Sequence, residues 1–175
     1  TFDHISAIGF TDVMFGGNVT VNQVKTDEDC YAGFVIGAKQ RTVVEQSDGY
    51  YLALYKDGYV RLKRNGKELA KSNTTYGSSA KLWMMQKENH LEVYVNGVYC
   101  EELSMIIGSF DGGVVGIASY NTNSTFSELC LTDLTNEELP VKPGKYDHVI
   151  SGDVKIKGGN YDAVNNVYRV TGKNA

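Results

Sequence analysis

The fold is decided by one stretch of the chain, which reads Tyr50-Tyr-Leu-Ala-Leu-Tyr-Lys-Asp-Gly-Tyr-Val-Arg-Leu-Lys-Arg-Asn-Gly66. It holds two short apolar runs, 50–55 and 59–63, and a turn signal follows each of them, Asp57-Gly58 and then Asn65-Gly66. Asp-Gly and Asn-Gly between alternating runs are strong signals for a β-hairpin, because a type I′ turn needs positive φ at both central residues. The stretch therefore predicts consecutive antiparallel strands joined by tight turns.

The same pattern of short apolar runs and turns extends along the chain in both directions from this stretch. No segment keeps a helical period over four turns. A regular series of short strands predicts an all-β fold, a two-sheet antiparallel jelly-roll sandwich. The other predicted strands are 19–24, 31–38, 81–86, 91–95, 98–102, 114–120 and 126–131, with turns at 26–29, 87–89 and Asn96-Gly97.

The composition is that of a folded domain with its own core. The chain has 175 residues, of which 42% are hydrophobic and 22% charged, values typical of a globular protein. Its net charge of −4 and the lack of a basic block argue against nucleic acid as a partner. No apolar run approaches the roughly 20 residues of a membrane span, so we expect no membrane insertion. The sequence is expected to be a mature module or a piece of a longer protein.

The three cysteines, Cys30, Cys100 and Cys130, have no spacing typical of metal ligands. We interpret them as small buried hydrophobic residues. One disulfide with one free thiol is the alternative.

Both prolines of the chain, Pro140 and Pro143, fall in one segment, 139–145, which we predict to be a linker. The predicted domain organisation is therefore a main body of the sandwich at 1–138, the linker, and a closing segment at 146–175. Two more strands are predicted in the closing segment, at 153–157 and 167–170, with Gly158-Gly159-Asn160 between them.

The order of turns and apolar strands in five segments, 31–38, 49–58, 60–63, 91–97 and 113–118, resembles that of a known group of proteins. These are the concanavalin A-like and laminin G-like jelly-roll modules. The resemblance is greatest to the family 66 carbohydrate-binding modules, which are attached to fructan-cleaving and related glycoside hydrolases. It covers almost the whole chain, and it supports the prediction of a concanavalin-like sandwich.

The opening strand pair of that family is similar to a segment near the end of this chain, 151–161, which has Val154 where the family usually has Trp. Two explanations are open. The module is circularly permuted, so that its last strands close the sheet, or the segment is the start of a following repeat in a tandem array. We expect the strands to close the sheet, within the chain or by exchange with a neighbour, because an unpaired edge invites aggregation.

The resemblance implies a function in glycan binding. The first hypothesis is a non-catalytic carbohydrate-binding module of a secreted or cell-surface glycan-degrading protein. Its location would be extracellular, and its partners a polysaccharide or oligosaccharide and a parent catalytic domain. A laminin G-like adhesion or protein-interaction module is one alternative, and a sandwich-fold glycoside hydrolase is another. We expect no enzyme, because a glycosidase needs two carboxylates at a fixed separation and the acidic run at 27–29 lies in a predicted turn.

A sugar presents an apolar C–H face rimmed by hydroxyls, so its site needs an aromatic ring beside polar side chains. Alternation places Tyr51 and Tyr55 on one face of their run, and Tyr59 and Arg61 on one face of the next. If the two runs form a hairpin, these four side chains share one surface, which we predict to be exposed. The structural alternative is that tyrosine is simply favoured on half-buried sheets.

Three more residues are candidates for carbohydrate binding. Tyr120 and Asn121 end a strong apolar run and begin a polar loop, a position typical of binding loops. Trp83 is the only tryptophan of the chain, and it could stack on a sugar. A lone tryptophan in an apolar strand is more often part of a core, and that is the alternative here.

A structural calcium ion is common in this superfamily, and the resemblance leaves one open here. Carboxylates suit calcium, which takes oxygen ligands. No contiguous loop of this chain has the spacing of a calcium site, so no ligand set is assigned. The candidate ligands are Asp27, Asp29, Glu128 and Asp133.

Overall fold

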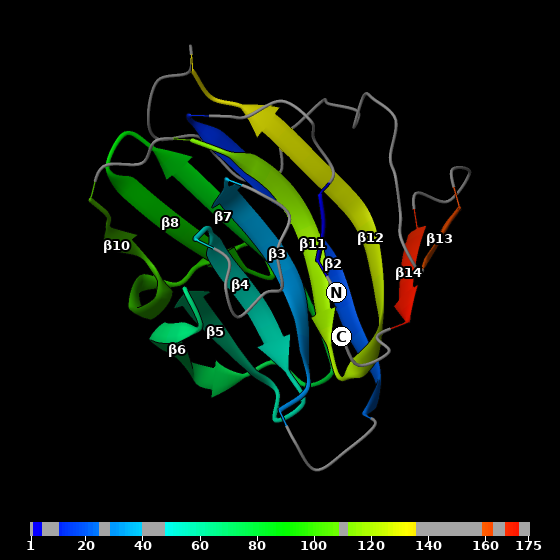
Figure 1. Cartoon of the computed structure of the whole chain (residues 1–175). Helices are drawn as coiled ribbons and strands as arrows, with labels where there is room; N and C mark the ends of the chain where they lie inside the picture. The colour runs from blue at the N-terminus through cyan, green and yellow to red at the C-terminus, as the bar shows by residue number, and fades with distance from the viewer. Residues whose placement is uncertain are drawn as a thin grey trace.

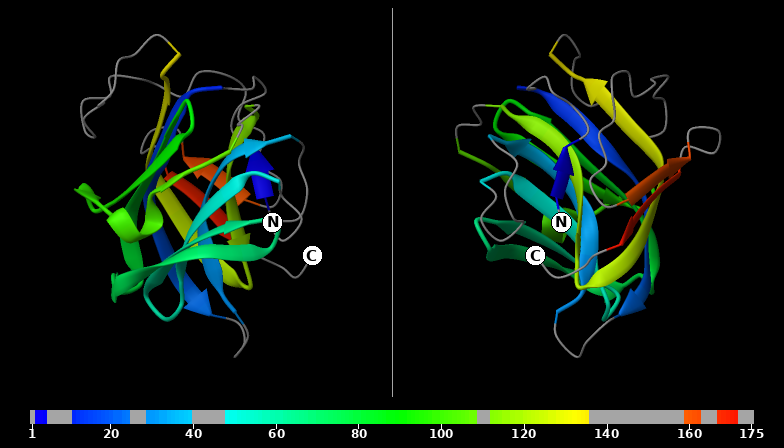
Figure 2. Two further views of the ribbon diagram at one scale, coloured as in Figure 1. Left: turned by 90° about the vertical axis from the view of Figure 1, so that its left-hand side faces the viewer. Right: turned by 45° about the vertical axis from the view of Figure 1, so that its right-hand side comes forward.

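The computed structural model describes residues 2–4, 11–24, 29–39, 48–108, 112–135, 159–162 and 167–171. Two antiparallel sheets pack against each other as a sandwich (Figures 1 and 2). The first, the six-stranded sheet, has the strand order β1-β11-β3-β4-β5-β6. Its strands are β1 (Phe2–His4), β11 (Val114–Tyr120), β3 (Tyr31–Ala38), β4 (Tyr50–Tyr55), β5 (Tyr59–Arg64) and β6 (Lys67–Thr75).

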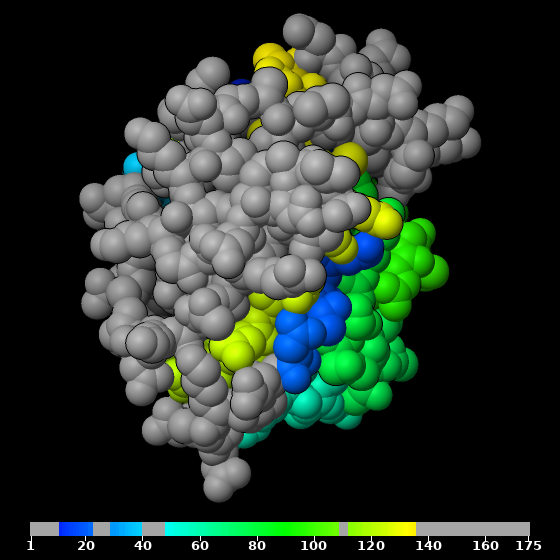
Figure 3. Space-filling model, turned by 90° about the vertical axis from the view of Figure 1, so that its right-hand side faces the viewer, coloured from blue at the N-terminus to red at the C-terminus, as the bar shows by residue number. Residues whose placement is uncertain are grey.

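The second, the eight-stranded sheet, has the order β10-β8-β7-β2-β12-β14-β13, and β9 also pairs with β8. In Figure 3 the blue surface of β2 lies between a yellow-green and a green region, in agreement with its place between β12 and β7. The strands are β10 (Met105–Ile106), β8 (His90–Val95), β7 (Ser79–Lys87), β2 (Val13–Val24), β12 (Thr122–Asp133), β14 (Val167–Thr171), β13 (Gly159–Asp162) and β9 (Val98–Tyr99), with a 3₁₀ helix at Glu101–Leu103. Among the described residues, no helix is long and apolar enough to cross a membrane.

The core lies between the two sheets, because one side of each alternating strand is apolar. Phe34 of β3 is at its centre, with its ring edge-on to Phe15 of β2 at 5.5 Å between centroids and to Phe126 of β12 at 5.6 Å. Such edge-to-face pairs stabilise a core beyond the area that they bury. The predicted all-β sandwich is confirmed.

Two of the three predicted Gly-containing turns have the expected backbone, whereas at Asp57-Gly58 only Gly58 has a positive φ, of 81°, and its amide donates to the Tyr55 carbonyl at 2.9 Å. Asn65 and Gly66 have φ of 50° and 69°, and Asn96 and Gly97 have φ of 52° and 81°. Positive φ at both central residues is the requirement of a type I′ hairpin. Three strands of the six-stranded sheet, β3, β4 and β11, have the bounds predicted from sequence.

Several strand predictions are corrected by the structure, among them 126–131, which is only the middle of β12 because Thr122 and Asn123 belong to that strand and not to a polar loop. The predicted strand 19–24 is only the second half of β2, which begins at Val13, because Gly16 and Gly17 lie inside the strand and not in a turn. Strand β6 was missed, since Ser72 is its only buried residue and it shows no apolar alternation. The predicted strand 98–102 ends after Tyr99, because the chain turns into the 3₁₀ helix that buries Leu103.

The end of the chain extends the eight-stranded sheet. Strand β14 pairs with β12, and β13 pairs with β14. Gly159 and Asn160, predicted to separate two strands, instead belong to β13, because they pair with Val170 and Arg169. The predicted linker 139–145 and the predicted strand 153–157 lie outside the described residues. The division into main body, linker and closing segment stays a prediction, as does the choice between permutation and a following repeat.

All three cysteines are free thiols, which agrees with the first interpretation of them. Cys30 and Cys100 are buried, and Cys130 is half-buried. Burial raises the pKa of Cys100 to about 11, with a further contribution from the neighbouring Glu102 carboxylate. A thiol with so high a pKa carries almost no thiolate at neutral pH and is chemically inert there.

Candidate functional site

Three tyrosines form a row across one end of the six-stranded sheet, on its outer face. Tyr31 of β3 pairs with Tyr120 of β11 on one side and with Tyr55 of β4 on the other. The ring of Tyr31 stacks on Tyr55 at 4.6 Å between centroids and on Tyr120 at 5.1 Å. We call Tyr120, Tyr31 and Tyr55 the tyrosine row.

The tyrosine row is packed rather than solvated. Tyr31 is 1% exposed, Tyr55 is 4% exposed and the adjacent Tyr51 is 1% exposed. The ring of Tyr51 lies 5.6 Å from that of Tyr31, and its hydroxyl donates to the carbonyl of Ala118 at 3.2 Å. The prediction that Tyr51 and Tyr55 are exposed is therefore wrong, because β4 is buried on both of its faces. Their predicted role in carbohydrate binding stays a prediction.

The prediction that Arg61 lies on the same face of the sheet as Tyr51 and Tyr55, in contrast, is confirmed. Arg61 pairs with Ala53, and Lys63 pairs with Tyr51, so their side chains share the outer face with the tyrosines. The Arg61 guanidinium carbon lies 4.0 Å from the centroid of the Tyr55 ring. Cations attract the faces of aromatic rings, so Arg61 joins the packed cluster to the more exposed part of the face.

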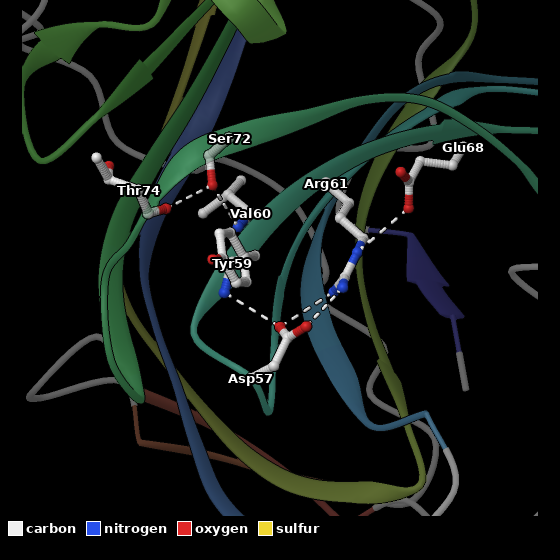
Figure 4. Close-up of polar contacts among 7 residues, drawn as sticks. All are labelled: Asp57, Tyr59, Val60, Arg61, Glu68, Ser72 and Thr74. Carbon is white, nitrogen blue, oxygen red and sulfur yellow. Dashed lines mark hydrogen bonds and ion pairs between the residues drawn. The ribbon is translucent and has the colours of Figure 1, made fainter.

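Arg61 is held by two carboxylates of the chain itself (Figure 4). Its two terminal nitrogens donate to Asp57, Nη1 to Oδ1 at 3.1 Å and Nη2 to Oδ2 at 2.6 Å. Its Nε lies 3.2 Å from Oε2 of Glu68. Bidentate pairs of this kind fix geometry as well as charge. The Arg61 guanidinium was predicted to bind a sugar. In the structure it holds Asp57 and Glu68 in place, and their side chains are 42% and 48% exposed.

The charge state of Asp57 follows from this contact. Partial burial by itself would raise the pKa of Asp57, but the hydrogen bonds from Arg61 and from the Tyr59 amide, together with the Arg61 charge, outweigh it. The pKa of Asp57 therefore lies below its usual value, and the carboxylate is ionised at neutral pH. The same contact raises the pKa of Arg61, although burial alone would lower it.

This pKa shift predicts a pH dependence of stability. Because the pKa of Asp57 is depressed on folding, its contribution is full above the unfolded pKa and is lost as the pH falls through the folded pKa. We expect Asp57→Asn to lower the free energy of unfolding by less than about 1 kcal/mol at pH 7, since the Asp57 side chain is 42% exposed and Arg61 keeps its contact with Glu68. The difference in unfolding free energy between Asp57→Asn and the parent should become smaller below about pH 4. Urea unfolding curves recorded at a series of pH values measure it. A difference that stays constant from pH 7 to pH 2 would contradict the ionic origin.

Beyond Arg61 the outer face becomes accessible. Tyr59 is half-buried, and the ammonium of Lys71 on β6 lies 3.8 Å from the centroid of its ring. Lys71 is exposed and pairs across the strands with Arg61. We call the surface formed by Asp57, Tyr59, Arg61, Glu68 and Lys71 the β5–β6 platform. It offers a ring, carboxylate acceptors and an ammonium donor within one hairpin and the turn before it.

The platform rests on a fixed edge strand. The buried hydroxyl of Ser72 accepts a hydrogen bond from the Val60 amide at 3.0 Å and donates to the carbonyl of Thr74 at 2.8 Å (Figure 4). These bonds tie β6 to β5 at the point where the register shifts between Tyr59 and Arg61. Glu68 and Lys71 were not among the residues predicted for the site, because β6 was not predicted. The signal that could have found it was the Asn65-Gly66 turn, which implies a returning strand.

The remaining candidates lie apart from the platform. Trp83 is buried on the outer face of the eight-stranded sheet with Met14, Met85 and Leu134, which supports its structural interpretation. Asn121 is buried at the turn from β11 to β12, with a φ of 49°, and its side-chain nitrogen donates to the Asp29 carbonyl at 3.4 Å. Tyr120 belongs to the tyrosine row.

The described candidates for calcium do not share a site. Glu128 and Asp133 are five residues apart on β12, roughly 15 Å along a strand. Glu128 lies 3.4 Å from Lys81, and Asp133 accepts hydrogen bonds from Thr135. Asp29 lies beside Asn121, and Asp27 is outside the described residues. Within the described part of the chain, no group of three or more His, Cys, Asp or Glu residues could hold a metal ion. The described candidates, Asp29, Glu128 and Asp133, therefore do not fit a common calcium ion.

No protein-family model matches the sequence, and no curated protein matches it significantly. Among solved structures, the carbohydrate-binding module of family 66 from Bacillus subtilis superposes with a TM-score of 0.60 at 13% identity, over 74% of this chain and 80% of that one.

Two further solved structures superpose with a TM-score above 0.5. The lumenal domain of VIP36, in a form bound to Ca²⁺ and Man3GlcNAc, gives 0.52 at 14% identity, over 75% of this chain and 71% of that one. The alginate lyase AlgAT5 of polysaccharide lyase family 7 gives 0.51 at 13% identity, over 75% of this chain and 62% of the lyase. Identities this low establish the arrangement of strands alone. The chain therefore has the concanavalin A-like jelly-roll fold.

Proposed function

We propose that the chain is a non-catalytic carbohydrate-binding module and that its ligand binds at the β5–β6 platform. The observation that carries the proposal is the half-buried ring of Tyr59 beside two exposed carboxylates, Asp57 and Glu68, that Arg61 holds in place. The apolar C–H face of a sugar packs on such a ring. Its hydroxyls donate to carboxylates, which accept hydrogen bonds only.

The structural comparisons support the same function. The solved structures described above are a carbohydrate-binding module, a domain bound to an oligosaccharide and a lyase named for the polysaccharide alginate. Function does not follow from fold alone. The fold supports the proposal because the platform supplies, independently, the ring and the polar groups that a sugar needs.

The proposal that the module is non-catalytic rests on the state of the platform carboxylates. A glycosidase separates the pKa values of its two carboxyl groups, so that one is a protonated acid near neutral pH. Here Asp57 and Glu68 both bind Arg61, and the pKa of Asp57 is lowered. An ionised carboxylate held by a guanidinium cannot donate a proton to a leaving group.

We also propose that the module acts outside the cell, attached to a protein that degrades glycans. Many polysaccharides are extracellular materials, and a separate binding module keeps an attached catalytic domain close to an insoluble substrate, which raises the effective concentration. The resemblance to family 66 modules supports this setting.

The test is a binding screen of the purified chain against a panel of polysaccharides, followed by titration calorimetry with the polymer that binds best. We expect Tyr59→Ala to weaken that binding by about tenfold or more, since the loss of one stacking surface of 1.4 kcal/mol corresponds to a factor of ten. Tyr99→Ala is the matched control, because Tyr99 is a 50% exposed tyrosine on β9 of the other sheet. Binding to no polysaccharide, or equal losses in the two variants, would refute the proposed site.

A further inference from the structure

We infer that Lys71 is a movable lid on the Tyr59 ring, and that a glycan displaces its ammonium when it binds at the β5–β6 platform. The inference rests on the proposed glycan-binding function and describes how access to that same site is controlled. It comes from the position of the Lys71 ammonium, from the difference between Lys71 and Arg61, and from the charge beside the ring.

The first observation is that a cation lies over the ring on which the sugar is proposed to pack. The Lys71 Nζ atom is 3.8 Å from the centroid of the Tyr59 ring, the shortest cation–ring distance among the described residues. Packed groups lie about 3.5 to 4 Å apart, so the ammonium takes the place over the ring that the C–H face of a sugar needs. The ring attracts the ammonium, and without a ligand the ring is therefore covered.

The second observation is that Lys71 is free to move and Arg61 is not. Arg61 also lies over a ring, that of Tyr55 at 4.0 Å, but two carboxylates hold its guanidinium and its side chain is only 15% exposed. Lys71 is exposed, and it forms no ion pair with any described residue. Exposed side chains change rotamer within nanoseconds. Lys71 can therefore leave the Tyr59 ring without any change in the strands, whereas Tyr55 stays covered.

The third observation is the charge that a displaced ammonium meets. Asp57 and Glu68 share one guanidinium, so these two carboxylates and one cation have a net charge of −1. Lys71 pairs with Arg61 across the strands and lies on the same part of the sheet. Burial raises the pKa of Asp57, hydrogen bonds and charge from Arg61 and the Tyr59 amide lower it, and the charge of Lys71 lowers it further. The ammonium thus keeps an electrostatic partner when it leaves the ring, and opening the lid costs little beyond the cation–ring contact.

This arrangement predicts that removing the lid strengthens binding. The parent and Lys71→Ala are titrated in a calorimeter with the polysaccharide that binds the parent best in the screen. We expect Lys71→Ala to bind about two- to fivefold more tightly, the factor that corresponds to one exposed cation–π contact. Lys67→Ala is the matched control, because Lys67 is an exposed lysine of the same strand whose partner across the hairpin is Arg64. It should bind as the parent does. Urea unfolding of both variants confirms that they are folded.

A second measurement follows the lid itself. Protons that lie over the face of an aromatic ring resonate upfield of their ordinary position. The ε-methylene protons of Lys71 should therefore be shifted upfield in the free chain and return to the ordinary lysine position when the platform is saturated with an oligosaccharide. In Tyr59→Ala the upfield shift should be absent from the start. The signal reports where the Lys71 side chain lies, which a contribution to stability alone would not change.

The outcomes separate the two proposals. Tighter binding by Lys71→Ala alone, with loss of the upfield shift at saturation, would support the lid. If Lys71→Ala binds no more tightly than the parent, if Lys67→Ala gains as much, or if the upfield shift persists at saturation, the lid is overturned and glycan binding stands. If neither the parent nor the variants bind any polysaccharide of the panel, both proposals are overturned.

Discussion

Gly33→Ala should lower the free energy of unfolding more than any other substitution that adds a single methyl group to the six-stranded sheet. A Cβ atom at Gly33 would lie 2.6 Å from the Ala53 Cα and closer still to the Leu52 carbonyl oxygen. Both are backbone atoms of the paired strand β4, so no side chain can rotate away. We expect the free energy of unfolding to fall by about 4 kcal/mol or more, above the usual range for overpacking.

The measurement is urea unfolding followed by far-ultraviolet circular dichroism. Gly108→Ala is the matched control, since Gly108 is exposed and its Cβ would meet no atom within 4 Å. We expect the control to change the unfolding free energy by less than about 0.5 kcal/mol. If Gly33→Ala unfolds at the same urea concentration as the control, the close pairing of β3 and β4 is wrong, and with it the position of the tyrosine row.

Substituting Tyr31 by alanine should have the second largest effect, and it should act on stability. The ring of Tyr31 is 1% exposed and contacts the rings of Tyr51, Tyr55 and Tyr120. Removing a buried aromatic side chain lowers the free energy of unfolding by about 3 to 5 kcal/mol. Tyr31→Phe keeps the ring and should lose far less. Urea unfolding of the two variants measures the difference.

The same pair of variants distinguishes two roles of the tyrosine row. If the row is structural, Tyr31→Ala is strongly destabilised, whereas Tyr59→Ala remains stable and binds glycan weakly. If the row is instead the surface on which a sugar stacks, Tyr31→Ala folds as well as the parent and loses binding. A stable Tyr31→Ala variant would therefore contradict the burial of the tyrosine row and would indicate that the row contacts the ligand.

The parts of the fold that could be predicted from sequence are those in which local signals are strong. Strand β4 is a short apolar run, strand β5 alternates apolar and polar residues, and a Gly-containing turn joins them, so their faces, their pairing and, to within one residue, their bounds could be predicted. Strand β6 could not, because an edge strand that faces water on most of its length has no apolar period. The half of β2 before Val19 was missed because Gly16 and Gly17 are typical of turns. They lie in the strand since neighbouring backbones approach them closely.

The candidate site could be predicted only in part, because alternation gives the face of a residue and not its burial. Tyr51, Tyr55, Tyr59 and Arg61 do share one face. Burial depends on what covers that face, which the pattern within a strand does not record, so Tyr51 and Tyr55 were expected in solvent. The partners of Arg61 could not be predicted either. Asp57 was interpreted as a turn residue, and Glu68 lies on the strand that was missed.

The most direct test of the central claim is a map of the glycan contact on the folded chain. Backbone amide resonances are recorded while the chain is titrated with an oligosaccharide of the polymer that binds best. If the β5–β6 platform is the site, the largest shifts should fall at 57–61 and 67–71, while β8 and β9 should stay unchanged. Shifts confined to the eight-stranded sheet, or no shift at any concentration of a ligand that binds in the screen, would contradict the claim.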